Sequence, residues 1–448
     1  MQYDTNTINA IKTTERIKAL DVIRGIVLLG ILLMNINGFG LANAYDNPTV
    51  AGGAEGLNLY TWMTTSMLFE GTMRGLFSLL FGVGMYILLK RSQDRGAGIA
   101  GPDIYFRRLL WLLFFGLVHG YLLLWKGEIL YDYALMGLLV YSFRNMAPKK
   151  LMLIAGFLVC VGTLWNYLDH QDNMKLVANV ASAETQKAAG VALTPEQEEA
   201  TTSWRDIQKK KSPAFINAYN EKMQSGYITV VKHLAPLNRV TDTVWFYKYD
   251  LWDILSMMLL GIALFKLNIL SAKRSYRVYG LMVAAGYLVG LAINYYEVQT
   301  ILNGDFSFLA FSKAEITYYL GRLAMSIGHV GAIMILVKAP LLKWLKRRLA
   351  AVGQMALTNY IMHSIICMIV FTGVGFGLFG KLQRFELLYV VFSIWIFQLI
   401  ISPIWLKYFE FGPLEWLWRR LSYLQKPAFR KKAIPKETTE VAVAVPVS

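Results

Sequence analysis

The chain has 448 residues, of which 56% are hydrophobic and 17% charged, with a formal net charge of +16 and two cysteines. Its repeated apolar runs of membrane-crossing length exclude an ordinary soluble globule and indicate a polytopic, all-α membrane protein. The basic residues cluster at the ends of these runs, which argues against nucleic acid as a partner, and both cysteines lie inside apolar runs, which argues against a disulfide framework or a metal site.

The first predicted helix follows a polar leader and runs apolar from Val22 to about Phe39. No small-residue cleavage site follows it, so we expect a retained helix rather than a removed signal. Arg24 and Asn35 are eleven residues apart, which places them on nearly the same face, about 16 Å from each other. They could offer a cation and an amide to one interior. Alternatively, Asp21 pairs with Arg24 at the interface and Asn35 only holds helices together.

Nine further apolar segments bring the expected number of crossings to ten. They cover about 57–90, 109–125, 128–143, 150–168, 250–270, 276–297, 316–337, 351–372 and 386–407. A polar insertion between the fifth and sixth segments is rich in helix-forming residues and contains a capping-box pattern at Thr194-Pro195-Glu196-Gln197. A short interfacial helix is expected around Trp416–Arg420. We therefore divide the chain into a membrane half at 1–168, a helical insertion at 169–248, a second membrane half at 249–423 and a disordered tail at 424–448.

The distribution of basic residues predicts the orientation. Lysine and arginine crowd the leader, the tail and alternate loops such as 90–108 and 338–348, whereas the loops between them hold few. By the positive-inside rule, both termini face the cytoplasm and the insertion is extracytoplasmic. We expect a multi-pass protein of a bacterial cytoplasmic (inner) membrane, with membrane lipids as its surroundings and a homo-oligomer left open.

The most suggestive of the five histidines is His119, near the end of the third segment. The tight turn at Trp125-Lys126-Gly127 places His119 and Asp132 at matching depths of a helical hairpin, and Glu128 lies one turn from Asp132. A carboxylate that holds one imidazole nitrogen leaves the other free as a general base. The alternative is a structural polar cluster that closes the hairpin.

Depth along the helices adds two residues to this candidate site. Asn35 is expected near the same end of the bundle as His119, and Arg74 lies toward the same end of the second segment. Asn35, Arg74, His119, Glu128 and Asp132 could therefore ring one outward-facing cavity, where Asn35 or Arg74 would stabilise an oxyanion.

Other arginines lie toward the opposite end of the bundle. Arg24, Arg107 and Arg108 could bind the phosphates of a coenzyme, although positive-inside placement explains the last two equally well. Arg322 and His329 share one face of the eighth segment and either line a path or only bond neighbouring helices.

Several stretches carry a family resemblance. Leu20-Asp21-Val22-Ile23-Arg24-Gly25 followed by Asn35 resembles the first-helix signature of the transmembrane acyltransferase superfamily, which includes heparan-alpha-glucosaminide N-acetyltransferase and bacterial O-acyltransferases of envelope sugars. Over nearly its whole length the chain most resembles the bacterial YeiB-like family. The further matching stretches are 77–84, 127–134, 353–360 and 411–419.

The resemblance implies an acyltransferase with a displaced base. The envelope O-acyltransferases carry a catalytic histidine where this chain has Asn35, and the heparan-type enzymes resemble it in having asparagine there. Their histidine lies in the segment leading into the second helix, but residues 41–70 here contain none. If the chemistry is shared, His119 is the natural candidate for the base.

These observations lead to one main hypothesis. We expect a membrane acyltransferase that takes an acyl group from cytoplasmic acyl-CoA, the suspected co-substrate, and passes it to a hydroxyl or an amine at the outer face. His119 would be the base, Asp132 or Glu128 would orient it, Asn35 and Arg74 would contact the reacting carbonyl, and Arg24 would serve the coenzyme. The acceptor would be an envelope sugar, a lipid head group or a small metabolite. No metal is expected.

Two alternatives from other classes stay open. A small-solute transporter or channel fits the multiple spans and the polar residues within them, although no inverted repeat is evident. A structural or assembly protein without turnover is the third possibility.

Overall fold

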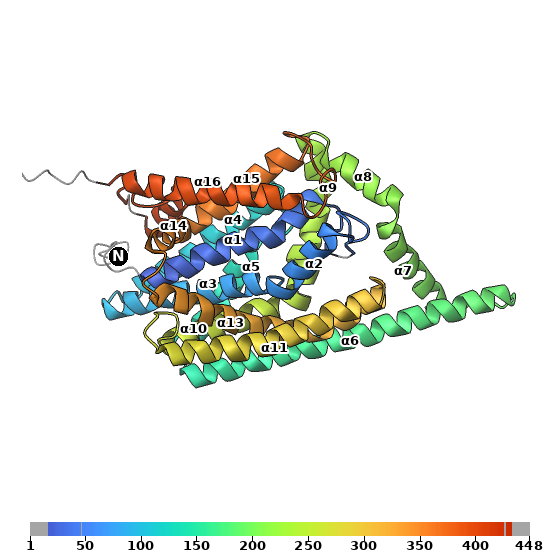
Figure 1. Cartoon of the computed structure of the whole chain (residues 1–448), viewed down its shortest axis with the longest axis horizontal. Coiled ribbons are helices and arrows are strands. Elements are labelled where there is room, and N and C mark those ends of the chain that lie inside the picture. Colours follow the sequence, from blue (N-terminus) through green and yellow to red (C-terminus); the bar gives the residue numbers. More distant parts are fainter. Residues whose placement is uncertain (1–16, 46, 425–426, 432–448) are drawn as a thin grey trace, which may run out of the picture.

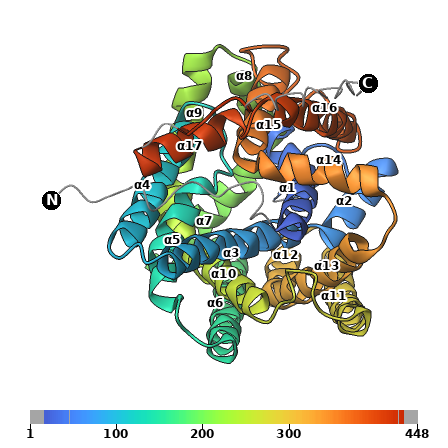
Figure 2. The ribbon, with the colours of Figure 1, turned by 90° about the vertical axis from the view of Figure 1, so that its left-hand side faces the viewer.

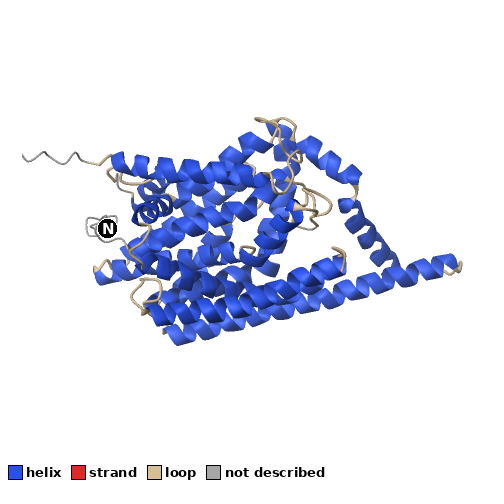
Figure 3. Ribbon diagram, viewed as in Figure 1, coloured by secondary structure: helices blue, strands red, loops and turns tan. Residues whose placement is uncertain are grey.

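The computed structural model describes residues 17–45, 47–424 and 427–431, and each regular element named within them is a helix (Figures 1 and 3). The only bridge between extended segments in these residues joins Phe409 and Arg430. This confirms the predicted all-α class. The basic leader before Ile17 and most of the tail predicted to be disordered lie outside the described residues.

The helices pack as one bundle with an extension at one end (Figure 1). In chain order they are α1 (Lys18–Gly40), α2 (Leu57–Leu68), α3 (Thr72–Asp94), α4 (Ala100–Tyr121), α5 (Leu130–Phe143), α6 (Pro148–Ala188), α7 (Pro195–Lys211), α8 (Pro213–Met223), α9 (Tyr227–Val240), the π-helical η3 (Thr241–Asp250), α10 (Leu251–Lys266), α11 (Tyr276–Asn303), α12 (Phe308–Ala314), the 3-10 helix η4 (Glu315–Thr317), α13 (Tyr318–Lys338), α14 (Lys343–Gln354), α15 (Ala356–Phe371), α16 (Leu387–Tyr408) and α17 (Pro413–Tyr423). We call the two ends of the bundle the α14 end and the α8 end.

Helix α1 is the centre of the bundle (Figure 2). Its largely apolar sequence makes it buried on most sides, against α3, α14, α15 and α16. Asp21 in its first turn complements the positive end of the helix dipole. A Cβ added at Gly25 would collide with the backbone of Leu349, and one at Gly353 with the backbone of Asp21. The close crossing of α1 and α14 therefore depends on two glycines.

In the part of the chain that the structure describes, six helical segments are long and apolar enough to cross a membrane, and the bent pair α14 and α15 would make a seventh. These segments identify a membrane protein. Helices α5 and α10, with 14 and 16 residues, are shorter, and α4 carries two arginines and a histidine. Ten crossings, the inner membrane and the cytoplasmic location of both termini therefore stay predictions.

The second predicted segment is broken. Instead of one helix over about 57–90, α2 ends at Leu68 and α3 begins at Thr72. Gly71 in the break has φ of +65°, a conformation that side chains with a Cβ rarely adopt. The break lies against Tyr318 and Arg322, which a Cβ at this glycine would meet.

The polar insertion is helical, as expected, but it begins differently. Helix α6 continues through residue 168 to Ala188, because its polar half keeps good helix formers. Thr194 caps α7 through the predicted capping box with Gln197. Helices α7, α8 and α9 then return to the bundle at the α8 end (Figure 1), and η3 joins α9 to α10. The extracytoplasmic location of this insertion stays a prediction, as does the division into domains.

Candidate functional site

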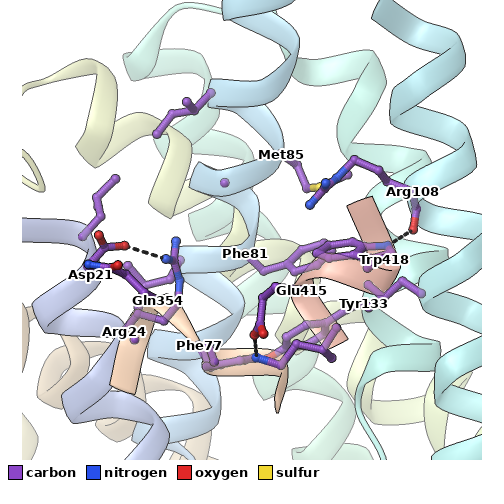
Figure 4. Close-up of a pocket in the computed structure, with 18 of the residues that line it drawn as sticks. Asp21, Arg24, Phe77, Phe81, Met85, Arg108, Tyr133, Gln354, Glu415 and Trp418 are labelled. Atoms are coloured by element: carbon purple, nitrogen blue, oxygen red, sulfur yellow. Dashed lines mark hydrogen bonds and ion pairs between the residues drawn. The ribbon is translucent and has the colours of Figure 1, made fainter. Parts of the chain in front are cut away.

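An apolar cavity of about 260 Å³ opens at the α14 end of the bundle (Figure 4). We call it the apolar cavity. Its walls come from α1, α3, α4, α5, α17 and the α14–α15 junction, whose side chains are mostly aliphatic or aromatic. They include Leu20, Phe77, Leu80, Phe81, Met85, Leu112, Leu130, Leu357 and Trp418.

Charged side chains gather around this apolar cavity. Arg24 donates to Asp21 at 3.1 Å and keeps about a quarter of its side chain exposed. Arg108 stacks over the ring of Trp418 at 3.7 Å, and the Trp418 indole donates to the carbonyl of Arg108. Two of the three predicted coenzyme arginines, Arg24 and Arg108, therefore line the cavity (Figure 4). The third, Arg107, pairs with Asp103 on its own helix and does not line it.

Two tyrosines line the deep part of the apolar cavity. The hydroxyls of Tyr133 and Ser78 are 2.8 Å apart, and Tyr133 also donates to the carbonyl of Arg74 at 3.3 Å. The ring of Tyr360 contacts the imidazole of His119 edge to face, with centroids 5.0 Å apart. Tyr360 thus lines this cavity and also contacts the predicted base, His119.

Of the two carboxylates expected to orient His119, Glu128 is the one that contacts it. The Nδ1 atom of His119 lies 3.3 Å from Glu128 Oε1, and its Nε2 atom lies 2.6 Å from the hydroxyl of Ser364 on α15. The same carboxylate accepts from the backbone N–H groups of Leu130 and Tyr131, and so caps α5. All three side chains are buried. No described hydrogen bond joins His119 to the other predicted partner, Asp132, although Asp132 is buried nearby on α5.

Arg74 belongs to a different group, which we call the charge cluster. It donates to Asp250 at 2.8 Å and to Asp253 at 2.7 Å, and Asp253 also pairs with Arg322. The two arginines and two aspartates of this cluster have a total formal charge of zero. Because Arg74 also accepts from Tyr133, the charge cluster lies beside the deep part of the apolar cavity.

A second, polar cavity of about 120 Å³ lies toward the α8 end. We call it the polar cavity. It is lined by α1, α2, α11, α13 and the two loops that precede α2 and α16, and its charged lining side chains are Glu70, Glu297, Glu315, Arg322 and Arg384. The charge cluster borders the polar cavity through Arg322, which lines it, and is connected to the apolar cavity by the hydrogen bond from Tyr133 to the Arg74 carbonyl.

Asn35 is only partly buried, makes no described hydrogen bond and lines neither cavity. Asn37, two residues later, is buried instead and accepts from Arg384 at 3.2 Å. Burial lowers the pKa of Arg384, and the nearby Glu70 and Tyr45 raise it again. Among the described hydrogen bonds, only that between His119 and Glu128 joins two of the five residues expected to ring one cavity.

Four residues of these sites were not picked out by sequence reasoning: Ser364, Asp250, Asp253 and Arg384. The one local signal was the spacing of Asp250 and Asp253, which puts two carboxylates on one helical face. Arg322 had been noted as a polar residue inside a predicted span. Among the described residues, no group of three or more histidines, cysteines or carboxylates could hold a metal ion.

Comparisons with known proteins agree with one another. Residues 264–425 match a family described as "Protein of unknown function (DUF418)". The chain is 31% identical over 417 residues to "Uncharacterized protein YeiB" of Escherichia coli, and the aligned region covers 91% of this chain and 96% of that protein. It is 28% identical over 431 residues to "Uncharacterized protein YxaH" of Bacillus subtilis, covering 94% and 97%. No solved structure matches.

Proposed function

Because the chain belongs to the YeiB-like family and encloses an apolar cavity with arginines in its wall, we propose that it is a membrane acyltransferase. Its donor would be acyl-CoA, bound in the apolar cavity. Its acceptor would be a hydroxyl or an amine of an envelope sugar, a lipid head group or a small metabolite. The protein would lie in the bacterial inner membrane with the α14 end toward the cytoplasm, where acyl-CoA is found.

The combination of an apolar interior and arginines is the observation that carries this proposal. A coenzyme A thioester joins a phosphorylated nucleotide to an acyl chain. Arg24 and Arg108 line the cavity and offer guanidinium groups, which suit phosphate oxygens in charge-assisted pairs. Aliphatic and aromatic walls would hold the acyl chain out of water. A purely anionic solute would have no use for such walls.

The reacting carbonyl would lie near the two tyrosines of the deep part. His119 is held at Nδ1 by Glu128, and its Nε2 lies against the Ser364 hydroxyl. In our proposal the acceptor attacks the thioester carbon and the C–S bond breaks. The acceptor's proton passes through Ser364 to His119 and then to the leaving thiolate. Asn35 and Arg74 take no direct part in this scheme, and Asp132 only adds charge nearby.

Transport is the second candidate, and one observation favours it. Two cavities approach from opposite ends of the bundle, and a charge-balanced cluster stands beside both. Alternating access in carriers uses this kind of central barrier. Under this alternative the apolar cavity would bind the transported solute, and no covalent step would follow.

Binding of acyl-CoA to the purified protein in nanodiscs tests the proposal. Acetyl-CoA and palmitoyl-CoA are titrated by calorimetry against wild type, Arg24→Gln and Arg108→Gln. Each substitution should weaken binding about tenfold, the equivalent of roughly 1.4 kcal/mol for one lost phosphate contact. Arg107→Gln is the matched control, because Arg107 lies next to Arg108 in the chain but does not line the cavity, and it should leave affinity unchanged.

Turnover provides the second arm of the test. Release of free coenzyme A with a membrane extract as acceptor should be lost in His119→Ala, while acyl-CoA binding persists. If neither thioester binds and the protein moves solutes into liposomes, transport replaces acyl transfer. If thioesters bind but His119→Ala retains full turnover, His119 is not the base.

A further inference from the structure

The polar cavity is lined by two buried guanidinium groups, and some of their N–H groups have no partner among the described residues. Arg322 and Arg384 are 1% and 3% exposed, and both line this cavity. Arg384 uses its two terminal nitrogens on Asn37 and on the carbonyls of Ala44 and Ala51, but its Nε atom has no hydrogen bond. The Nε and Nη2 atoms of Arg322 have none either. Buried donors are nearly always paired, so these atoms call for an acceptor.

Carboxylates with spare acceptor capacity line the same cavity. Glu297 on α11 accepts one hydrogen bond, from Thr317 at 2.6 Å, and Glu70 in the break between α2 and α3 accepts one from Ser66. A carboxyl group keeps acceptor capacity in either protonation state, so both have free oxygen positions. The polar cavity therefore presents unpaired donors and unfilled acceptors together.

The charges narrow the chemistry of the occupant. The charge cluster is neutral as a unit, so the charge of Arg322 is already balanced by Asp253. A simple anion would gain from the arginine N–H groups but would leave the free acceptor oxygens of Glu70 and Glu297 unfilled. A simple cation would satisfy the carboxylates and leave the arginine donors unpaired. A molecule with one group of each sign meets both demands.

We propose that the polar cavity binds a compact zwitterion, a small amino acid or a similar molecule with one carboxylate and one ammonium group. Its carboxylate accepts from Arg322 and from Arg384 Nε, and its ammonium donates to Glu297 and Glu70. A volume of about 120 Å³ suits a small solute of this kind. The proposal does not depend on acyl transfer, because such a site would serve a carrier as well as an enzyme.

Two zwitterions and three control compounds distinguish a zwitterion site from an anion, a cation or a hydroxyl site. The wild-type protein in nanodiscs is titrated by calorimetry with glycine and γ-aminobutyrate, then with acetate, ethylammonium and glycerol. At least one of the two zwitterions should bind, and the other three should bind at least tenfold more weakly. Equal binding of acetate would make this an anion site, equal binding of ethylammonium a cation site, and equal binding of glycerol a hydroxyl site. Each of these results overturns the proposal, as does no binding at all.

Variants then assign the contacts. Glu297→Gln keeps the shape of the side chain and should weaken the bound zwitterion at least tenfold while leaving the unfolding temperature near that of wild type. Arg384→Lys should do the same, and Arg107→Gln, which lines no part of this cavity, should change nothing. If Arg384→Lys fails to fold, Glu297→Gln alone decides. Unchanged affinity in Glu297→Gln would refute the placement of the ammonium and with it the proposal.

Discussion

Removing the carboxylate of Asp253 should destabilise the protein more than any other single charge change in the bundle. Asp253 is 1% exposed and pairs with both Arg74 and Arg322, of which Arg322 is equally buried. Asp253→Asn keeps the size of the side chain but leaves the Arg322 charge without its counter-ion. Breaking a buried pair in this way costs about 3–5 kcal/mol.

The measurement is unfolding by SDS titration in mixed micelles, read from tryptophan fluorescence. Asp94→Asn is the matched control, because Asp94 pairs with Lys90 where both side chains are more than half exposed, and such pairs contribute about 0–1 kcal/mol. The double variant Asp253→Asn/Arg322→Met removes both charges, and should therefore cost less than the sum of the single changes, by about 1–3 kcal/mol.

The outcome can refute the reasoning in two ways. If Asp253→Asn costs no more than Asp94→Asn, the guanidinium of Arg322 is solvated and the charge cluster is not a dry one. If the single changes add up in the double variant, the two residues do not depend on each other. Either result would also weaken the view of the charge cluster as a barrier between the two cavities.

Two further predictions concern packing and pH. Gly25→Ala places a methyl group against the backbone of Leu349 and should destabilise the protein by about 1–3 kcal/mol, whereas Gly280→Ala, with open space around it, should be neutral or mildly stabilising in the same unfolding assay. Burial lowers the pKa of His233, and two nearby lysines lower it further. Because the unfolded chain then binds the proton more readily, stability should fall as the pH drops below about 6.5. The wild type should lose more in unfolding temperature between pH 7.5 and pH 5.5 than His233→Gln does, and identical losses would contradict this.

Helices were the part of this molecule most open to prediction from sequence. The largely apolar run from Val22 to Phe39 predicts the body of α1, because such a run in a membrane protein is satisfied only as a helix, although α1 begins four residues earlier, at Lys18. The break between α2 and α3 was missed, since its cause is an arginine and a tyrosine brought against Gly71 from α13, far away in the chain. The extra length of α6 was missed because polarity marked the end of an expected span, and polarity does not end a helix.

Depth in the hairpin matches His119 with Asp132, whereas the described hydrogen bond of His119 is to Glu128, one turn away from Asp132. The choice between Glu128 and Asp132 could not be made from depth. Glu128 precedes the first turn of α5, and its carboxylate turns back to two free backbone N–H groups there. An acidic residue just before a helix is a capping signal that local sequence does carry. It would have favoured Glu128 as the residue with a fixed position.

Rotation about each helix axis decided the rest, and the two asparagines of α1 illustrate why. Asn35 shares a face with Arg24, and that common face made it attractive as a partner in one cavity. Yet the buried amide is Asn37, whose position two residues later turns it toward Arg384 in a loop more than three hundred residues away. No periodicity in α1 encodes that arginine. Since the arginines of the polar cavity are placed by such distant contacts, its chemistry follows from how the helices are rotated in the assembled bundle, and a test of ligand binding there is equally a test of those rotations.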